Sequence, residues 1–388
     1  MSWTFIIRPR ELRKFQKCRR EWDFSSQVRQ RYAKKVPGIG WAFDKSIRDA
    51  LAVYYFPAMD DWDRAIVRPL AIKGFDRSMQ ENRAAHERVA PYTAADEQAY
   101  AEHVELGHAM LANYFVWAAA LDDFDSLFAD HDIWAPVPDP ARPVQDLGTL
   151  DGRPIRYMGR MDQLIADPDD ELWIVDHRVV RGPWTDNEQL IDDEVLRSHC
   201  WHTQIAYPQM LIAGTITNEL RVDGQLEAPP VTEIVERDQR TMIGSRHVNT
   251  RRSPLAMEPT STPAARSAAT TQDQIVLQQD NGLFRRTVIR RNQDSMRDVG
   301  VRVAQLALEF RDPDVAVPPT FAEHCATCEF QAPCAAMESG GDWRALLATD
   351  FYQRDADAED ESLRHSDQRA GTRAFLGGTF RVINLGRR

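Results

Sequence analysis

Three cysteines towards the end of the sequence have the spacing of ligands to a metal centre. Their spacing is Cys-x2-Cys-x5-Cys, formed by Cys325, Cys328 and Cys334. Thiolates favour zinc or iron–sulfur centres, and a tetrahedral site needs a fourth ligand. Two further cysteines are available. Cys18 lies in a basic stretch whose charge would lower thiol pKa values, whereas Cys200 stands near a different motif.

Two other interpretations of these cysteines remain open. Free cysteine is often a small buried apolar residue, although this spacing is seldom accidental. Zinc ligands commonly come in pairs separated by two residues, but a second such pair is missing here. An iron–sulfur centre that uses one remote cysteine fits the spacing better. The odd total of five cysteines argues against a disulfide framework.

A second constellation consists of two carboxylates. Asp162 ends the sequence Gly-Arg-Met-Asp, and Asp176 begins Asp-His-Arg, which ends at Arg178. Both aspartates fall on neighbouring predicted strands, where side chains two apart share a face. Two convergent carboxylates can bind Mg²⁺, which activates water and neutralises charge on a phosphodiester. The alternative is a strand end with a surface ion pair. Gln204 and Tyr207 follow on a predicted helix, which could equally be a half-buried face.

The elements that must position these residues follow from periodicity and turn residues. Helices are expected after Pro9, with Cys18 on the inner side, and over 43–55, 100–115, 186–196, 202–212 and 296–310. One hairpin is expected from strands 154–166 and 171–180, and another from strands 274–279 and 283–290 around Asp-Asn-Gly. The order of helices, strands and helices predicts an α/β or α+β fold.

Composition limits the class of protein. Hydrophobic content of 43% and charged content of 28% are ordinary for a globular protein. No apolar run approaches the roughly 18 residues of a membrane span. The N-terminus turns basic too early for a signal peptide, so we expect a cytoplasmic protein without membrane association. The net charge of −11 leaves room only for a local basic channel for nucleic acid.

Together these features resemble the PD-(D/E)XK nuclease superfamily, and within it the RecB-type and CRISPR-associated iron–sulfur exonucleases and their phage relatives. In that family one cysteine lies in an N-terminal helix and three lie near the end of the chain. The resemblance implies a mixed sheet flanked by helices and a [4Fe-4S] cluster on Cys18, Cys325, Cys328 and Cys334. It also implies Mg²⁺ or Mn²⁺ on Asp162 and Asp176, with Arg178, Gln204 and Tyr207 as further catalytic residues.

The sequence departs from the family pattern at two positions. Arg178 replaces the family's lysine, and Arg48 stands where a helix should carry histidine. Arginine stays protonated and cannot activate water by giving up a proton. No lysine follows Lys73, so only an N-terminal lysine could substitute, Lys45 being the nearest to Arg48 in sequence. The tyrosine of the Gln204–Tyr207 pair also comes one residue early.

The expected organisation has four consecutive regions: a helical region over 1–150 that carries Cys18, a nuclease-like core over 151–320 with a mobile loop at 253–271, the cysteine motif at 321–345 and a tail at 346–388. Three functions remain open. The first is a metal-dependent DNA nuclease acting on single strands or ends, with a helicase or another protein as a possible partner. The second is a nuclease-derived DNA-binding or scaffold subunit without catalysis. The third is an RNA- or protein-binding module with structural zinc.

Overall fold

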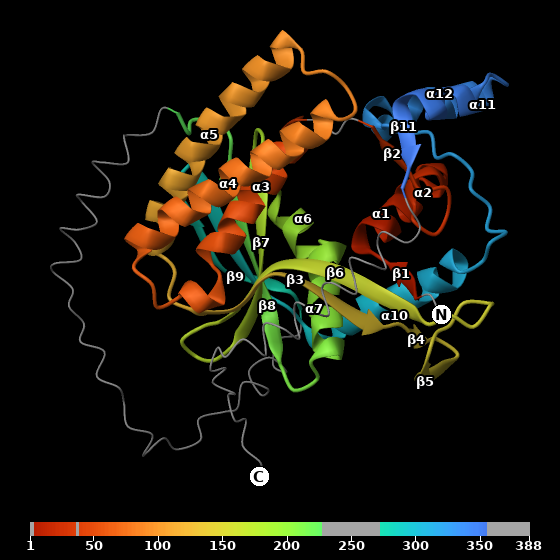
Figure 1. The fold of residues 1–388 in the computed structure, drawn as a ribbon. Helices are drawn as coiled ribbons and strands as arrows, with labels where there is room; N and C mark the ends of the chain where they lie inside the picture. Colours follow the sequence, from red (N-terminus) through yellow and green to blue (C-terminus); the bar gives the residue numbers. More distant parts are fainter. Residues whose placement is uncertain (1–3, 36–38, 227–271, 355–388) are drawn as a thin grey trace. The chain divides into compact units, whose positions relative to one another are not determined.

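The computed structural model describes residues 4–35, 39–226 and 272–354 (Figure 1). The chain has a mixed α/β architecture, with a mixed sheet flanked by helices. It divides into two compact units. Unit 1 comprises Met1–Lys35, Pro136–Met158 and Ala304–Arg388, and unit 2 comprises Val36–Ala135 and Gly159–Val303. The loop predicted at 253–271 and residues 355–388 of the predicted tail lie outside the described residues.

The central sheet combines antiparallel hairpins with parallel pairs of strands. Its strands follow the order β6 (Ile155–Ala166), β7 (Leu172–Val180), β8 (Ile212–Arg221), β10 (Phe284–Arg290) and β9 (Gln274–Asp280), and β3 (Asp125–Pro136) also pairs with β6. Strands β7 and β8 are parallel, so the chain must cross over between them. The crossover consists of α6 (Asn187–Ile191) and α7 (Glu194–Ala206). This crossover brings helical side chains towards the end of β7.

Both predicted hairpins are confirmed, and local turn chemistry explains each. Strands β6 and β7 pair antiparallel, with Gln163 opposite Val175. Asp167 closes their turn, because its Oδ1 accepts hydrogen bonds from the backbone of Asp169 at 3.0 Å and Glu171 at 2.8 Å. In the β9–β10 hairpin, Gly282 has a φ of 86°, which glycine adopts without strain.

A three-helix layer packs on one face of the unit 2 sheet. It consists of α3 (Ile39–Tyr54), α4 (Arg64–Glu87) and α5 (Ala94–Ala119), grouped together in Figure 1, with the short 3-10 turn η1 (Pro57–Met59) between α3 and α4. Their buried side chains form one core with Leu220 and Phe284. Helices α3 and α5 confirm the predicted helices. Helix α4 was not predicted, although Val67, Ala71 and Phe75 recur every four residues along its buried face.

Three predicted helices have wrong limits. The helix expected over 186–196 is interrupted, because α6 ends at Ile191 and α7 begins at Glu194. The helix expected after Pro9 breaks at Cys18, which has extended backbone angles (φ −158°, ψ 110°) and separates α1 (Pro9–Lys17) from α2 (Arg19–Ser25). The helix expected over 202–212 does not exist as such, because α7 ends at Ala206 and β8 begins at Ile212. Pro208 disfavours helical angles at Tyr207, which ends the helix there.

Unit 1 joins segments from both ends of the sequence. Phe15 and Trp22 pack against Phe310 at the end of α10 (Gln293–Phe310), with ring centroids 4.7 Å apart in each case. Phe24 packs with Phe330 in a second small core. The remaining elements are β1 (Phe5–Ile7), β2 (Tyr32–Lys34), β4 (Pro138–Asp139), β5 (Arg142–Asp146), η2 (Glu323–Thr327), α11 (Gln331–Glu338), α12 (Trp343–Asp350) and β11 (Phe351–Gln353). Strand β1 pairs in parallel with the first residues of β6, and β2 pairs antiparallel with β11.

Among residues 4–35, 39–226 and 272–354, no helix is both long enough and apolar enough to cross a bilayer.

Candidate functional site

The two aspartates singled out in the sequence lie close together on β6 and β7. The β6–β7 ladder ends at the pair of Gln163 and Val175, and Asp162 and Asp176 are the next residues on the two strands. Asp162 Oδ2 accepts a hydrogen bond from the backbone N–H of His177 at 2.8 Å. Both carboxylates are partly exposed. Like charges close together on neighbouring strands destabilise a sheet unless one of them is protonated or paired with a cationic group.

The electrostatics of the pair are asymmetric. Burial, followed by the negative charge of Asp176, raises the pKa of Asp162 to about 7. Burial also acts to raise the pKa of Asp176, but the charge and hydrogen bond of Arg178 outweigh it and lower that pKa below its ordinary value. Without a cation, the pair therefore holds one firmly ionised carboxylate and one that titrates near neutral pH.

Arg178 connects Asp176 to a third acid. Its Nε donates to Asp176 Oδ2, and its Nη2 donates to Asp193 Oδ2 at 2.9 Å. Asp193 is the N-cap of α7, where its Oδ1 accepts from the backbone of Val195 at 2.9 Å and Leu196 at 3.2 Å. The guanidinium thus bridges Asp176 and Asp193 and leaves Asp162 aside. Sequence reasoning did not find Asp193, because it placed this residue inside a helix expected over 186–196 and not at the start of one.

The residues present fit a hard divalent cation. In the described structure, Oδ1 of Asp162 and Oδ1 of Asp176 have no hydrogen-bond partner. Each carboxylate therefore keeps an oxygen for a ligand on the same face of the hairpin. Mg²⁺ and Mn²⁺ favour such oxygen donors and usually complete their shells with water and substrate phosphate.

Two basic side chains from helices also act on this pair. The charge of Arg48, on α3, lowers the pKa of Asp162, so the position expected to hold histidine does lie near the carboxylates. His199, on α7, lowers the pKa of Asp176 in the same way. Gly159 lies against His199, because a Cβ at Gly159 would approach His199 Cδ2 to 3.2 Å and His202 Cε1 to 2.6 Å. His199 was not singled out in the sequence.

Gln204 and Tyr207 engage other partners. The amide of Gln204 donates to the Met210 carbonyl and accepts from the Ile212 backbone at 3.3 Å, so it joins the end of α7 to the start of β8. Tyr207 stacks on Phe128, with ring centroids 6.0 Å apart. Within the described structure, neither side chain hydrogen-bonds to the two carboxylates. Their catalytic role stays a prediction.

The four cysteines expected to bind a cluster all lie in unit 1. Cys18, at the break between α1 and α2, accepts a hydrogen bond from the backbone N–H of Thr320 at 3.5 Å, and Cys325 Sγ donates to the Thr320 carbonyl at 3.6 Å. Burial raises the pKa values of Cys328 and Cys334, and the charge of Cys18 raises both further. Thr320 therefore contacts two of the four thiols, and the charge of Cys18 acts on the other two.

The surroundings of these thiols have features that fit a thiolate-bound cluster. The guanidinium of Arg20 hydrogen-bonds to Cys334 and lowers the pKa of its thiol against the effect of burial. A backbone N–H directed at Cys18 Sγ is a contact that tunes cluster potentials. Within residues 4–35, 39–226 and 272–354, the structure contains no group of three or more His, Cys, Asp or Glu side chains that could hold a metal ion. Cys200 lies in unit 2, fully buried, where burial raises its thiol pKa to about 12.

Comparison with known proteins gives little. No family model and no curated protein matches the sequence. Among solved structures, the crystal structure of SSO0001 matches with 9% sequence identity and a TM-score of 0.21, over 54% of this chain and 87% of that chain. A likeness this low carries no argument, so the function has to be inferred from the residues themselves.

Proposed function

We propose that this chain is an iron–sulfur deoxyribonuclease of the PD-(D/E)XK type, which hydrolyses phosphodiester bonds of DNA single strands or ends with Mg²⁺ or Mn²⁺. The observation that carries the proposal is the pair of Asp162 and Asp176. The two carboxylates lie close together at the end of the β6–β7 ladder, and each has an oxygen without a hydrogen-bond partner in the described structure.

The residues would divide the work as follows. Asp162 and Asp176 would hold the cation, which supplies an activated water and neutralises charge developing on the phosphate. Arg178 stays protonated, so it can bind a phosphate oxygen but cannot take a proton from water. Arg48, whose charge acts on Asp162, would add positive charge where the DNA backbone approaches.

The four cysteines would hold a [4Fe-4S] cluster in unit 1. The contacts of Thr320 with two of them and the hydrogen bond from Arg20 to Cys334 support this assignment. The cluster would link α1 and α2 to the segment that carries η2 and α11, since its ligands come from both ends of the sequence.

A second candidate is a DNA-binding or scaffold subunit that has lost catalysis. One observation favours it: Arg178 already pairs with Asp176, the carboxylate that the cation would need. In that case the guanidinium takes the place of the cation permanently, and the site serves binding alone.

Cleavage of labelled single-stranded DNA by the purified protein with Mn²⁺ separates the candidates. An active nuclease should lose cleavage in Asp162→Ala and Asp176→Ala and keep it in Asp169→Ala, which removes an exposed acid from the turn of the same hairpin. Salt-sensitive DNA binding without metal-dependent cleavage would support the second candidate. Cleavage that survives the combined Asp162→Ala and Asp176→Ala change would refute the site assignment.

A further inference from the structure

The side chain of Arg178 lies between a proposed metal ligand and an acid for which the proposed chemistry has no use. Its Nε bonds to Asp176, whereas its Nη2 bonds to Asp193 at 2.9 Å. The side chain of Asp193 is 9% exposed, that of Asp176 is 21% exposed and that of Arg178 is 27% exposed. The acid away from the carboxylate pair is therefore the more buried of Arg178's two partners.

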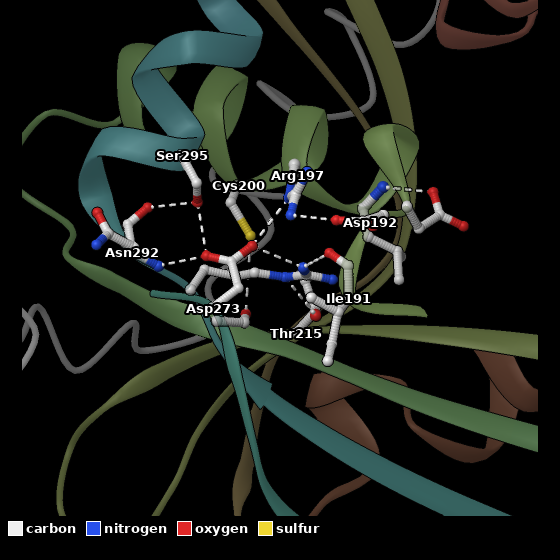
Figure 2. A network of polar contacts seen from close by, with 12 residues as sticks. Ile191, Asp192, Arg197, Cys200, Thr215, Asp273, Asn292 and Ser295 are labelled. Carbon is white, nitrogen blue, oxygen red and sulfur yellow. Dashed lines mark hydrogen bonds and ion pairs between the residues drawn. The ribbon is translucent and has the colours of Figure 1, made fainter. Parts of the chain in front are cut away.

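Asp193 is also the better anchored of the two. Its Oδ1 caps α7 through two backbone N–H groups, and the α6–α7 junction that carries it is tied to the sheet. Buried Arg291 bonds to the carbonyls of Leu190, at 2.9 Å, and Ile191 in that junction. Figure 2 shows Ile191 in the same polar network as Asp273, and Arg291 also pairs with Asp273 at 2.9 Å. One donor of the Arg178 guanidinium therefore lies on an acid that α7 holds in place.

We propose that Asp193 is a positioning residue that takes over the guanidinium of Arg178 when a divalent cation binds Asp176. This inference rests on the proposed cation site. A cation on Oδ1 of Asp176 would repel the guanidinium on Oδ2 of the same carboxylate, and a partly buried charge without a partner is costly. Arg178 can leave Asp176 cheaply only because its five donors already include one on Asp193. Asp193 thereby makes an arginine tolerable at a position where its charge would otherwise repel the cation.

Binding of Mn²⁺, followed through the electron paramagnetic resonance signal of the free ion, tests this without any measurement of cleavage. Asp193→Asn keeps an N-cap, since asparagine caps as well as aspartate, but it removes the charge that receives Arg178. We expect Mn²⁺ affinity to fall by about ten-fold or more, as for loss of a charged hydrogen-bond partner. The matched control is Asp186→Asn, because Asp186 caps α6 through Glu188 at 2.8 Å and does not bond to Arg178.

A second pair of variants separates positioning from a plain charge effect. Arg178→Gln should bind Mn²⁺ more tightly than wild type, and in that background Asp193→Asn should lose most of its effect, because no guanidinium then needs a second acid. Two results would overturn the role of Asp193 and leave the cation site in place. One is an equal loss of Mn²⁺ affinity from Asp193→Asn in the wild-type and Arg178→Gln backgrounds. The other is a loss of Mn²⁺ affinity in Asp193→Asn no larger than in Asp186→Asn. Binding by Arg178→Gln but not by wild type would show that Arg178 never yields, which also overturns it. Absence of Mn²⁺ binding in every variant would remove the cation site and this inference with it.

Discussion

Asp162 Oδ2 accepts the backbone N–H of His177 at 2.8 Å while the charge of Asp176, at the same end of the β6–β7 ladder, acts on its carboxylate. Burial and the negative charge of Asp176 together raise the pKa of Asp162 to about 7, and this one hydrogen bond does not offset them. The folded protein therefore binds a proton at Asp162 that the unfolded chain releases at about pH 4.

This raised pKa predicts how the stability of cation-free protein depends on pH. Because the folded pKa exceeds the unfolded one, stability should fall as pH rises from about 4 to 7 and stay low above that window. Asp162→Asn, in EDTA, should stabilise the protein at pH 8 by about 1 kcal/mol, after discounting for partial exposure, and have no effect near pH 4. Urea unfolding at the two pH values measures this. Asp169→Asn, in the exposed turn, is the control, and equal effects of the two variants would contradict the prediction.

His177 predicts an opposite dependence at acid pH. Burial lowers its pKa to about 3, while its ring stacks on Tyr55 with centroids 5.6 Å apart. The unfolded chain binds a proton between pH 6.5 and 3 that the folded chain refuses, so stability should be lost as pH falls below about 6.5. At pH 5 this amounts to about 2 kcal/mol.

His177→Gln tests this, since glutamine can still accept the hydrogen bond that Asn218 donates to Nδ1 at 3.4 Å. The variant should lose less stability than wild type between pH 7 and pH 5 in urea unfolding. An acid slope identical to that of wild type would show that His177 is protonated in the folded protein.

The buried pair of Arg291 and Asp273 predicts a large stability effect. Arg291 is fully buried and bonds to Asp273 Oδ2 at 2.9 Å and to Thr215 at 3.2 Å (Figure 2). Arg291→Met should destabilise the protein by about 2 to 4 kcal/mol, because it leaves the carbonyls of Leu190 and Ile191 without this donor, whereas Asp273 keeps Arg197 as a partner. Arg297→Met is the control, since the Arg297 side chain is 73% exposed and its pair with Asp294 contributes little. Similar denaturation midpoints for the two variants would contradict the assignment.

The cysteine neighbourhood predicts a coloured protein. Protein purified without oxygen should be brown from thiolate-to-iron charge transfer, and Cys18→Ala should bleach it and lower its stability. Cys200→Ala is the matched control, because Cys200 is also buried and, among the described residues, its thiol bonds to the Gly214 carbonyl at 3.9 Å and to no cysteine of the motif. Iron and zinc analysis completes the measurement. A colourless protein that contains one zinc ion would show that the site binds zinc and not an iron–sulfur cluster, with the assignment of the four ligands unchanged.

Local features of the fold were predictable because they depend on neighbours in sequence. Asp-Asn-Gly at 280–282 and the acidic turn at 167–171 favour tight hairpins by themselves, and the second of these sets the register that brings Asp162 close to Asp176. The helices over 39–54 and 94–119 follow from apolar periodicity in the same way. The acidic pair is thus a consequence of one hairpin.

Only the tertiary structure decided what surrounds that pair. The crossover after β7 brings Asp193 to Arg178 and His199 near Asp176. The charge of Arg48 acts on Asp162 from α3, more than a hundred residues earlier in the sequence. The break at Cys18 likewise depends on packing against residues from the far end of the sequence, such as Phe310 and Thr320. Local sequence determines the two strands that carry Asp162 and Asp176, because turns and strand alternation involve only near neighbours. It does not determine the partners of Arg178, because helix packing and ion pairing join residues that only the folded chain brings together.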